Sequence, residues 1–406
     1  MYILVLDSIH GGKAIRDAYA ARGKTVDLVD VYRGKSEVDV QTALSRTYDL
    51  IVAPVHLNPD HPLLTYSRTR VITHHDAVRQ LLAGSAPEPM IEITGARGKT
   101  TTAHALAALM PGNGILHTSS GTFRFPEKEW IGRTSITPAS VLAAAEPARE
   151  EGGWLIAEES LGITGAGALG IITSGMDYPF AAGRKQAVAS KIASARHCSR
   201  LLLAEGIPAE ERTGIVHCED IASCDGITCT ISLDGEQYRF TNPLLALPAY
   251  RNALMLAAAA AVILGLDPTP LASFAALEGR MSARHENGVL IVDNANSGTN
   301  LLTTIDAAQY ARNVSGQDEI ILVIGQQEGD GAVCEGFAHD QILAAVEAIR
   351  PRHLIWVGRL PDTGTELSAR LAPLLTGHAQ TLGEGYTLAQ QKTDRGSIVL
   401  AVKTWR

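Results

Sequence analysis

The segment Gly95-Ala96-Arg97-Gly98-Lys99-Thr100 places glycines, a lysine and a hydroxyl in an order that suits the binding of phosphate groups. Glycines let backbone N–H groups close around phosphate oxygens, the lysine neutralises terminal phosphates, and the threonine hydroxyl can hold Mg²⁺. Residues 90–94 predict a strand before this segment and residues 103–110 predict a helix after it, so a helix N-terminus would add positive potential. Only two residues separate the first glycine from the Gly-Lys pair, where the usual loop has four, so an ordinary glycine turn is the alternative.

Other residues that could take part in nucleotide chemistry follow this loop along the chain. Glu158 ends the apolar run 154–157, Lys191 lies in a predicted helix, and Ser119 and Ser120 stand in a short polar turn. Taken alone, each has an ordinary interpretation: a solvated or capping glutamate, a surface lysine and a plain turn. Their order along the chain is what favours a shared function.

The order and spacing of these segments resemble the Mur ligase family, which also includes folylpolyglutamate synthetases. The matching segments are residues 94–101, 154–162, 171–177, 189–191, 249–253, 279–281 and 291–295. The resemblance implies an ATP-dependent ligase that uses Mg²⁺ and activates a substrate carboxylate as an acyl phosphate. Phosphoryl transfer develops negative charge, which a lysine, Mg²⁺ and backbone donors stabilise, so the residue types agree with this chemistry.

The same resemblance implies a role for each matching residue. The expected nucleotide-binding residues are Gly95, Ala96, Arg97, Gly98, Lys99, Thr100, Thr101, Asn252, Arg280 and Asp293. The expected catalytic residues are Lys99, Glu158 and Lys191, of which the last matches a lysine that many members carbamylate to bridge metal ions. The expected Mg²⁺ ligands are Thr100, Ser120 and Glu158.

Two positions depart from the family pattern. Tyr178 stands where the family usually has a histidine after an aspartate, and Arg251 replaces the histidine before Asn252. A second metal site could therefore be altered, and a nucleotide-binding regulatory module without catalysis is a competing hypothesis. The presence of the residues that the chemistry needs argues against that module: Lys99, Thr100, Glu158 and Asp293.

The length of 406 residues predicts more than one domain, because single cores rarely grow beyond about 250–300 residues. Strands alternate with helices, and a Gly-, Ser- and Pro-containing stretch at 83–89 reads as a linker. With the resemblance, this predicts a three-domain α/β architecture of the Mur ligase kind. Its parts are an N-terminal substrate-binding domain over 1–88, a central P-loop ATPase domain over 89–278 and a C-terminal Rossmann-like domain over 279–406.

The opening of the chain bears on the substrate. Residues 4–13 read as a strand, a glycine turn and a helix, which could bind an anionic group or simply connect two elements. Together with residues 29–34, they resemble a branch of the family in methanogenic archaea that closes the last carbocycle of a nickel tetrapyrrole. An amide ligase that joins an amino acid to a carboxylate is the runner-up.

A tetrapyrrole with many carboxylates would suit a first domain rich in donors, although no single histidine is assigned as a metal ligand. The donors are His10, Lys13, Arg33, His56, His61, Arg68, Arg70, His74 and His75.

Charge and composition exclude several other functions. A net charge of −8 and a pI near 5.9 argue against non-specific nucleic-acid binding. The N-terminus lacks the features of a signal peptide, and no apolar run is long enough to span a bilayer, so a cytoplasmic protein acting on a small molecule is expected. The five cysteines read as reduced thiols, and the choice between monomer and homodimer stays open.

Overall fold

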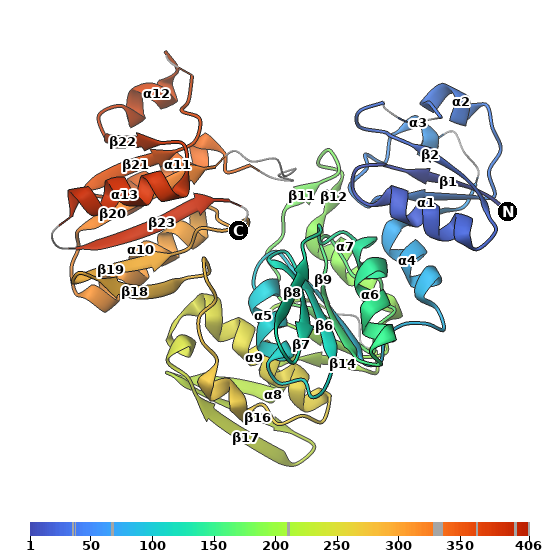
Figure 1. Cartoon of the computed structure of the whole chain (residues 1–406), viewed down its shortest axis with the longest axis horizontal. Helices are drawn as coiled ribbons and strands as arrows, with labels where there is room; N and C mark the ends of the chain where they lie inside the picture. The colour runs from blue at the N-terminus through green and yellow to red at the C-terminus, as the bar shows by residue number, and fades with distance from the viewer. Residues whose placement is uncertain are drawn as a thin grey trace. The chain divides into compact units, whose positions relative to one another are not determined.

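The structure is a computed structural model that describes residues 1–34, 36, 38–65, 69–208, 212–327, 336–362, 364–393 and 396–404 (Figure 1). It divides into two compact units, Met1–Phe274 and Ala275–Arg406. The first unit holds two mainly parallel sheets and two small antiparallel ones, and the second holds one mainly parallel sheet. The α/β class is therefore confirmed, whereas the domain limits at 88/89 and 278/279 stay a prediction.

The first sheet is parallel throughout, with the strand order β2-β1-β3-β4. Alternate side chains of its central strand enter two different cores, because successive side chains of a strand point to opposite faces: Ile3 and Val5 to one, Leu4 and Leu6 to the other. The strands are β1 Tyr2–Leu6, β2 Thr25–Val29, β3 Leu50–Ala53 and β4 Val71–Thr73. The helices are α1 Gly12–Ala21, α2 Val40–Leu44, α3 Pro62–Thr65 and α4 His74–Leu82.

The second sheet has eight strands in the order β14-β13-β10-β5-β9-β6-β7-β8. Its strands from β14 to β6 run parallel, and the edge strands β7 and β8 are antiparallel additions. The strands are β5 Met90–Thr94, β6 Gly114–Thr118, β7 Gly121–Phe125, β8 Glu129–Gly132, β9 Trp154–Glu158, β10 Leu169–Ile172, β13 Leu201–Leu203 and β14 Ile215–His217. The helices around it are α5 Lys99–Ala107, α6 Ser140–Glu150, α7 Ala187–Ser194, α8 Cys218–Ile221 and α9 Pro248–Ile263.

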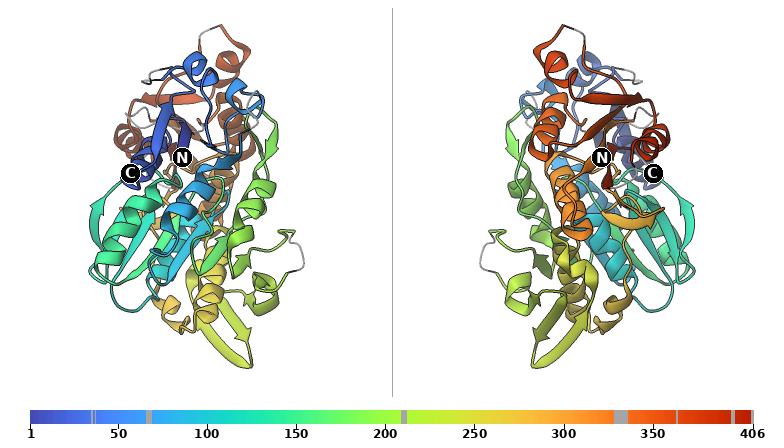
Figure 2. Two further views of the ribbon diagram at one scale, coloured as in Figure 1. Left: turned by 90° about the vertical axis from the view of Figure 1, so that its right-hand side faces the viewer. Right: turned by 90° about the vertical axis from the view of Figure 1, so that its left-hand side faces the viewer.

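Helix α9 packs between α5 and a small antiparallel ribbon. Its alanines at 257–261 are fully buried, and such small side chains allow neighbouring elements to approach closely. The ribbon has three strands, β15 Ala222–Asp225, β16 Thr228–Leu233 and β17 Glu236–Thr241. Figure 2 shows this yellow-green ribbon projecting beyond α9.

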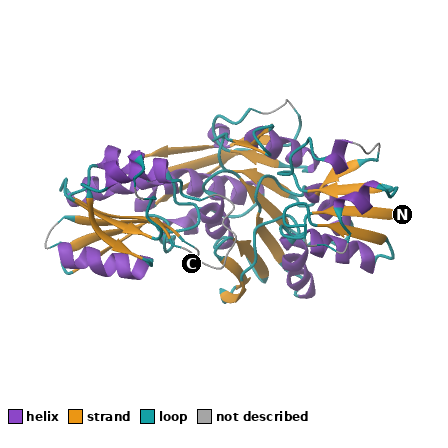
Figure 3. Cartoon of the chain, turned by 90° about the horizontal axis from the view of Figure 1, so that it is seen from above, coloured by secondary structure: helices purple, strands orange, loops and turns teal. Residues whose placement is uncertain are grey.

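The second unit is a six-stranded sheet in the order β18-β19-β23-β20-β21-β22, parallel except for the edge strand β18. Helices cover both of its faces (Figure 3). The strands are β18 Ser282–Glu286, β19 Val289–Asp293, β20 Ile320–Gln326, β21 His353–Val357, β22 Leu375–Ala379 and β23 Ser397–Lys403. The helices are α10 Leu301–Ser315, α11 His339–Ile349, α12 Glu366–Leu371 and α13 Leu382–Lys392.

Helix α5 starts at Lys99 rather than at the predicted residue 103, because Gly98 adopts φ 86° and the following threonines enter the helix directly. Helix α7, which contains Lys191, starts at Ala187, directly after Lys185–Gln186 (β12) pairs with Pro179–Phe180 (β11) in a short hairpin. Among the residues that the structure describes, no helix has the length and apolar character needed to cross a membrane.

Candidate active site

The glycine loop lies where β5 ends and α5 begins, at the carboxyl edge of the second sheet. Gly95 has φ 152°, and a Cβ there would lie 2.1 Å from the hydroxyl oxygen of Thr173, which follows the adjacent strand β10. The Thr173 hydroxyl is placed to donate to the carbonyl of Arg97 at 2.7 Å. Only glycine fits this close approach, so the loop is fixed against the neighbouring strand.

Lys99, Thr100 and Glu158 converge beside this loop. The Lys99 ammonium donates to the carbonyl of Gly95 at 3.0 Å and lies 3.7 Å from Glu158 Oε1. The Thr100 hydroxyl donates to Glu158 Oε2 at 2.7 Å. Glu158 is 2% exposed at the end of β9, so the interpretation as a solvated glutamate is wrong.

The turn between β6 and β7 brings one serine hydroxyl into this group and turns the other away. Ser119 Oγ lies 3.2 Å from the Thr100 hydroxyl, and its backbone N–H donates to Glu158 Oε2 at 3.1 Å. The hydroxyl of Ser120, the residue expected to hold Mg²⁺, lies 3.1 Å from His104 Nε2. The oxygen atoms that converge are therefore those of Thr100, Ser119 and Glu158, a set suited to Mg²⁺, which prefers oxygen ligands.

Lys191 lies on α7, away from the surface. Its side chain is fully buried, and the ammonium sits over the ring of Tyr178 at 4.8 Å from the ring centroid. The aromatic face attracts the cation, so the departure to tyrosine at 178 supplies this lysine with a contact. Asp177 Oδ1 accepts from the N–H of Val188 at 2.9 Å and so holds the start of α7. The surface interpretation of Lys191 is wrong, while its carbamylation stays a prediction.

The remaining expected nucleotide-binding residues lie in both units. Asn252 is exposed on α9 of the first unit, whereas Arg280 and Asp293 belong to the second. Asp293 ends β19, is buried, and accepts from the N–H of Ala295 at 3.0 Å. In the same unit, the Asn296 amide donates to the carbonyl of Gly279 at 2.6 Å and ties the loop after β19 to the chain before β18. In the first unit, Ala96 and Arg97 form the outer part of the glycine loop, and Thr101 is buried in α5.

Behind the site lies a pair of buried carboxyl groups that the sequence analysis missed. Glu92 accepts hydrogen bonds from the N–H groups of Thr164 at 2.8 Å and Gly167 at 2.7 Å. Burial and the neighbouring charge of Glu92 raise the pKa of Glu159 well above its usual range. Glu92 lies in the middle of a strand that is otherwise mainly apolar. An acidic residue at such a position is the sequence signal that could have revealed it.

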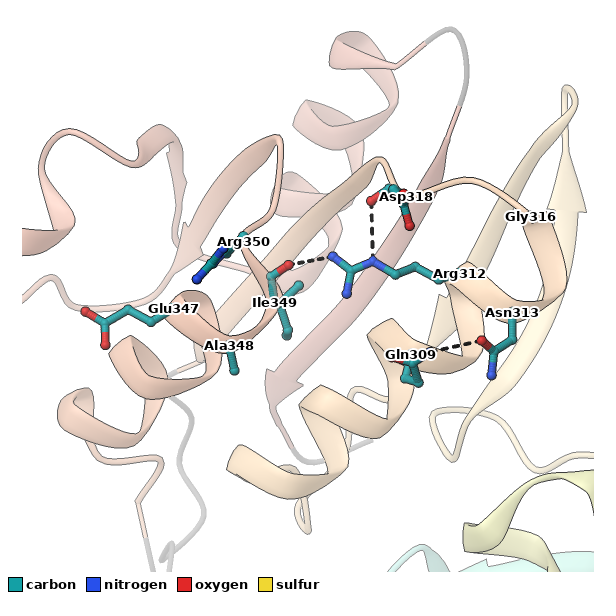
Figure 4. Close-up of a pocket in the computed structure, with 9 residues that line it drawn as sticks. All are labelled: Gln309, Arg312, Asn313, Gly316, Asp318, Glu347, Ala348, Ile349 and Arg350. Atoms are coloured by element: carbon teal, nitrogen blue, oxygen red, sulfur yellow. Dashed lines mark hydrogen bonds between the residues drawn. The ribbon is translucent and has the colours of Figure 1, made fainter.

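A hollow in the second unit is unrelated to this site. It lies between the ends of α10 and α11, where Arg312 donates to the carbonyl of Ile349 at 2.5 Å (Figure 4). Arg312 there caps the exposed carbonyl end of α11. The hollow contains none of the expected site residues.

Comparisons with known proteins agree with this fold. Solved structures of similar fold include a pseudomurein peptide ligase type C from Methanothermus fervidus, with a TM-score of 0.54, 14% identity and coverage of 99% of this chain and 97% of that one. Another is MurF from Acinetobacter baumannii, with a TM-score of 0.53, 13% identity and coverage of 92% of this chain and 86% of that one. Residues 283–404 match the family model "Coenzyme F430 synthetase CfbE, C-terminal domain".

Two relatives are similar along most of their length. Coenzyme F(430) synthetase of Methanosarcina acetivorans is 31% identical over 100% of this chain and 98% of its own. The enzyme of the same name from Methanocaldococcus jannaschii is 22% identical over 88% of this chain and 91% of its own. Fold, loop and relatives thus define an ATP-dependent ligase of the Mur ligase type. Within that class, the chain belongs to the coenzyme F(430) synthetase family.

Proposed function

We propose that this ligase activates a carboxylate of a nickel tetrapyrrole as an acyl phosphate and closes the last carbocycle of coenzyme F(430). A propionate oxygen of the seco-precursor would attack the terminal phosphorus of ATP, which releases ADP. A ring carbon would then lose a proton and attack the acyl carbon, which forms the carbon–carbon bond and breaks the bond to the leaving phosphate. The full-length similarity to coenzyme F(430) synthetase is the observation that carries this proposal.

The residues of the glycine loop have defined tasks in this reaction. The backbone amides of 95–98 and the Lys99 ammonium would hold the phosphates of ATP. Lys99 would also stabilise the negative charge that develops on the leaving group. Thr100, Ser119 and Glu158 would hold Mg²⁺, which when bound offsets charge on the terminal phosphates. Their mutual contacts support this, because they bring three oxygen ligands to one point beside the lysine.

The nucleoside part of ATP would be bound by Asn252, Arg280 and Asp293. Residues of both units have this role, so we propose that the second unit closes on the first during turnover. Closure would exclude water from the acyl phosphate, which hydrolyses readily.

The test is phosphate release from ATP by the purified full-length protein with Mg²⁺. The nickel seco-tetrapyrrole is supplied in one arm, and a panel of amino acids with carboxylate acceptors in another. Release with the tetrapyrrole, accompanied by loss of one water from its mass, is expected. Release only when an amine is present would make the protein an amide ligase, and no release with either would return it to a nucleotide-binding module.

The matched variant is Lys99→Ala. We expect it to lower turnover by at least a hundredfold, because one buried charge interaction with the transferring group is worth about 3 kcal/mol or more. Its far-ultraviolet circular dichroism should equal that of the wild type, since Lys99 is not part of the core. Near-normal turnover in this variant would contradict the assigned site.

A further inference from the structure

Three side chains that the proposed reaction does not use converge at the edge of the first sheet. Asp7 follows β1, His10 lies in the turn before α1, and His56 follows β3. Each offers one possible ligand atom, and these atoms all lie within 4.8 Å of one another. We propose that Asp7, His10 and His56 form a binding site for one divalent transition-metal ion, separate from the Mg²⁺ site.

The position in the sheet favours a ligand site. In the order β2-β1-β3-β4, the chain leaves β1 toward β2 on one side and returns to β3 on the other. In parallel sheets, ligands bind outside the carboxyl ends of strands where the order reverses in this way. Asp7 and His56 stand on the two sides of this point, and both come after the carboxyl ends of their strands.

Asp7 is held in the orientation that a metal ligand needs. It is fully buried, and its backbone has φ 80°, a left-handed conformation that residues other than glycine rarely adopt. Its Oδ1 accepts from the N–H of Ile9 at 2.7 Å and of His10 at 3.1 Å. Its Oδ2 lies 2.7 Å from His10 Nδ1 and 3.7 Å from His56 Nε2. One oxygen is thus fixed by the backbone, and the other faces both imidazoles, as in sites where outer contacts orient the ligand.

His56 presents a nitrogen that the described residues do not satisfy. Its Nε2 is enclosed by protein and has no hydrogen-bond partner among them. Its ring stacks on Tyr32 with a centroid distance of 5.6 Å and an interplanar angle of 19°. The ring of His10 meets it edge to face at 4.6 Å. The orientation of the imidazole is therefore set by packing, while its Nε2 is directed toward the Asp7 carboxylate.

The ligand set indicates the kind of metal. Two imidazoles and one carboxylate suit first-row divalent ions such as Zn²⁺, Co²⁺ or Ni²⁺, whereas Mg²⁺ and Ca²⁺ prefer oxygen atoms alone. A metal already held by the four nitrogens of a tetrapyrrole has room for one ligand on each face. Three ligands that converge from one side therefore fit a free ion rather than the metal centre of a macrocycle. Lys185 is a nearby cation, and its ammonium is directed to the carbonyl of Val55 at 2.9 Å.

The experiment uses the full-length protein after removal of metals with a chelator. Co²⁺ is titrated in, ligand-field absorption reports coordination, and elemental analysis gives the stoichiometry. We expect one Co²⁺ per chain with a spectrum of nitrogen and oxygen ligands. Asp7→Asn and His56→Phe should each weaken binding at least tenfold, as loss of a ligand or its support does in metal sites. His285→Ala, which removes an exposed histidine of β18 in the other unit, should bind Co²⁺ as the wild type does.

Three results would overturn the site. They are absence of Co²⁺ binding by the folded wild type, undiminished binding by both variants, and intense thiolate-to-cobalt bands that place the ion on cysteines. The first of these results counts against the site even where the protein binds a nickel tetrapyrrole. His56→Phe keeps the ring stacked on Tyr32, so it decides the matter even where Asp7→Asn fails to fold. Phosphate release is measured separately, so failure here leaves the proposed ligase reaction untouched.

Discussion

The carboxylate of Glu158 is contacted by groups from two parts of the first unit. Lys99 and Thr100 come from the start of α5, and Ser119 comes from the turn between β6 and β7. A buried carboxylate is costly unless such partners compensate it, and in the proposed function a metal ion would replace some of these contacts. Of the two adjacent serines of the turn, Ser119 contacts Glu158 and Ser120 contacts His104, so they should differ in their effect on Mg²⁺ binding.

We predict that Ser119→Ala raises the Mg²⁺ concentration needed for half-maximal phosphate release about five- to thirtyfold, because one hydrogen-bonding ligand is worth roughly 1–2 kcal/mol. Ser120→Ala should change it less than twofold, since that hydroxyl faces His104. Titration of Mg²⁺ while phosphate release is followed measures this concentration for both variants. Equal effects, or a larger effect of Ser120→Ala, would restore the serine that the sequence pattern suggested.

The buried carboxyl of Glu159 predicts a pH dependence of stability. Its pKa is raised by burial and by Glu92, so the folded protein retains a proton that the unfolded chain releases above about pH 4.5. The stability that this group contributes is fully present below the unfolded pKa and is lost as pH rises toward the folded pKa.

Glu159→Gln removes this titration while nearly keeping the shape of the side chain. The free energy of unfolding of this variant, relative to that of the wild type, should therefore increase as pH rises from 5 to 8. Urea unfolding of both proteins at pH 5, 6.5 and 8 measures the difference. A constant difference across this range would show that Glu159 titrates alike in the folded and unfolded chains.

At the scale of elements, the loop depends on the close approach of β5 and β10. Gly95→Ala would place a Cβ 2.1 Å from the Thr173 hydroxyl oxygen in a backbone conformation that alanine avoids. We expect ATP affinity to fall at least tenfold and stability to fall by about 1–3 kcal/mol. Equilibrium binding of a fluorescent ATP analogue and thermal unfolding measure the two effects.

Gly265→Ala is the matched control, because Gly265 also has a positive φ, 76°, but has nothing within 4 Å of an added Cβ. It should lose stability and keep ATP affinity. If both variants lost ATP affinity equally, the approach to Thr173 would not be the cause.

The elements that position the loop could be predicted from the sequence, and others could not. The strands β5, β9 and β10 are short apolar runs buried on both faces, a pattern typical of parallel sheets. Strands β6 and β7 mix glycine, histidine and arginine with apolar residues, so neither alternation nor an apolar run marks them. The choice between Ser119 and Ser120 depends on the register of this pair of strands, which adjacent identical residues cannot reveal.

At the scale of the whole molecule, the chain consists of two units with cores of their own. The core of the second unit is made of residues of β19, β20, β21, β23 and α13, with Ala295 and Ala379. The sequence predicted a C-terminal α/β part from alternating strands and helices, but not its strand order, because that depends on pairing between residues far apart in the chain.

We predict that residues 275–406 fold when expressed alone, because their core needs no side chain of the first unit. Thermal unfolding followed by circular dichroism should give one cooperative transition, and amide resonances should be well dispersed. A fragment without either property would show that the second unit depends on the first for its stability.

The pairing of Lys99 with Glu158 has a thermodynamic consequence for substrate binding. A nucleotide that takes the lysine leaves the buried carboxylate without its cation, and a metal ion that takes the carboxylate leaves the lysine without its anion. Each ligand therefore binds with less penalty when the other is present. If Mg²⁺ binds here as proposed, ATP and Mg²⁺ would by linkage raise each other's affinity by the same factor, and the loop would select the metal–nucleotide complex.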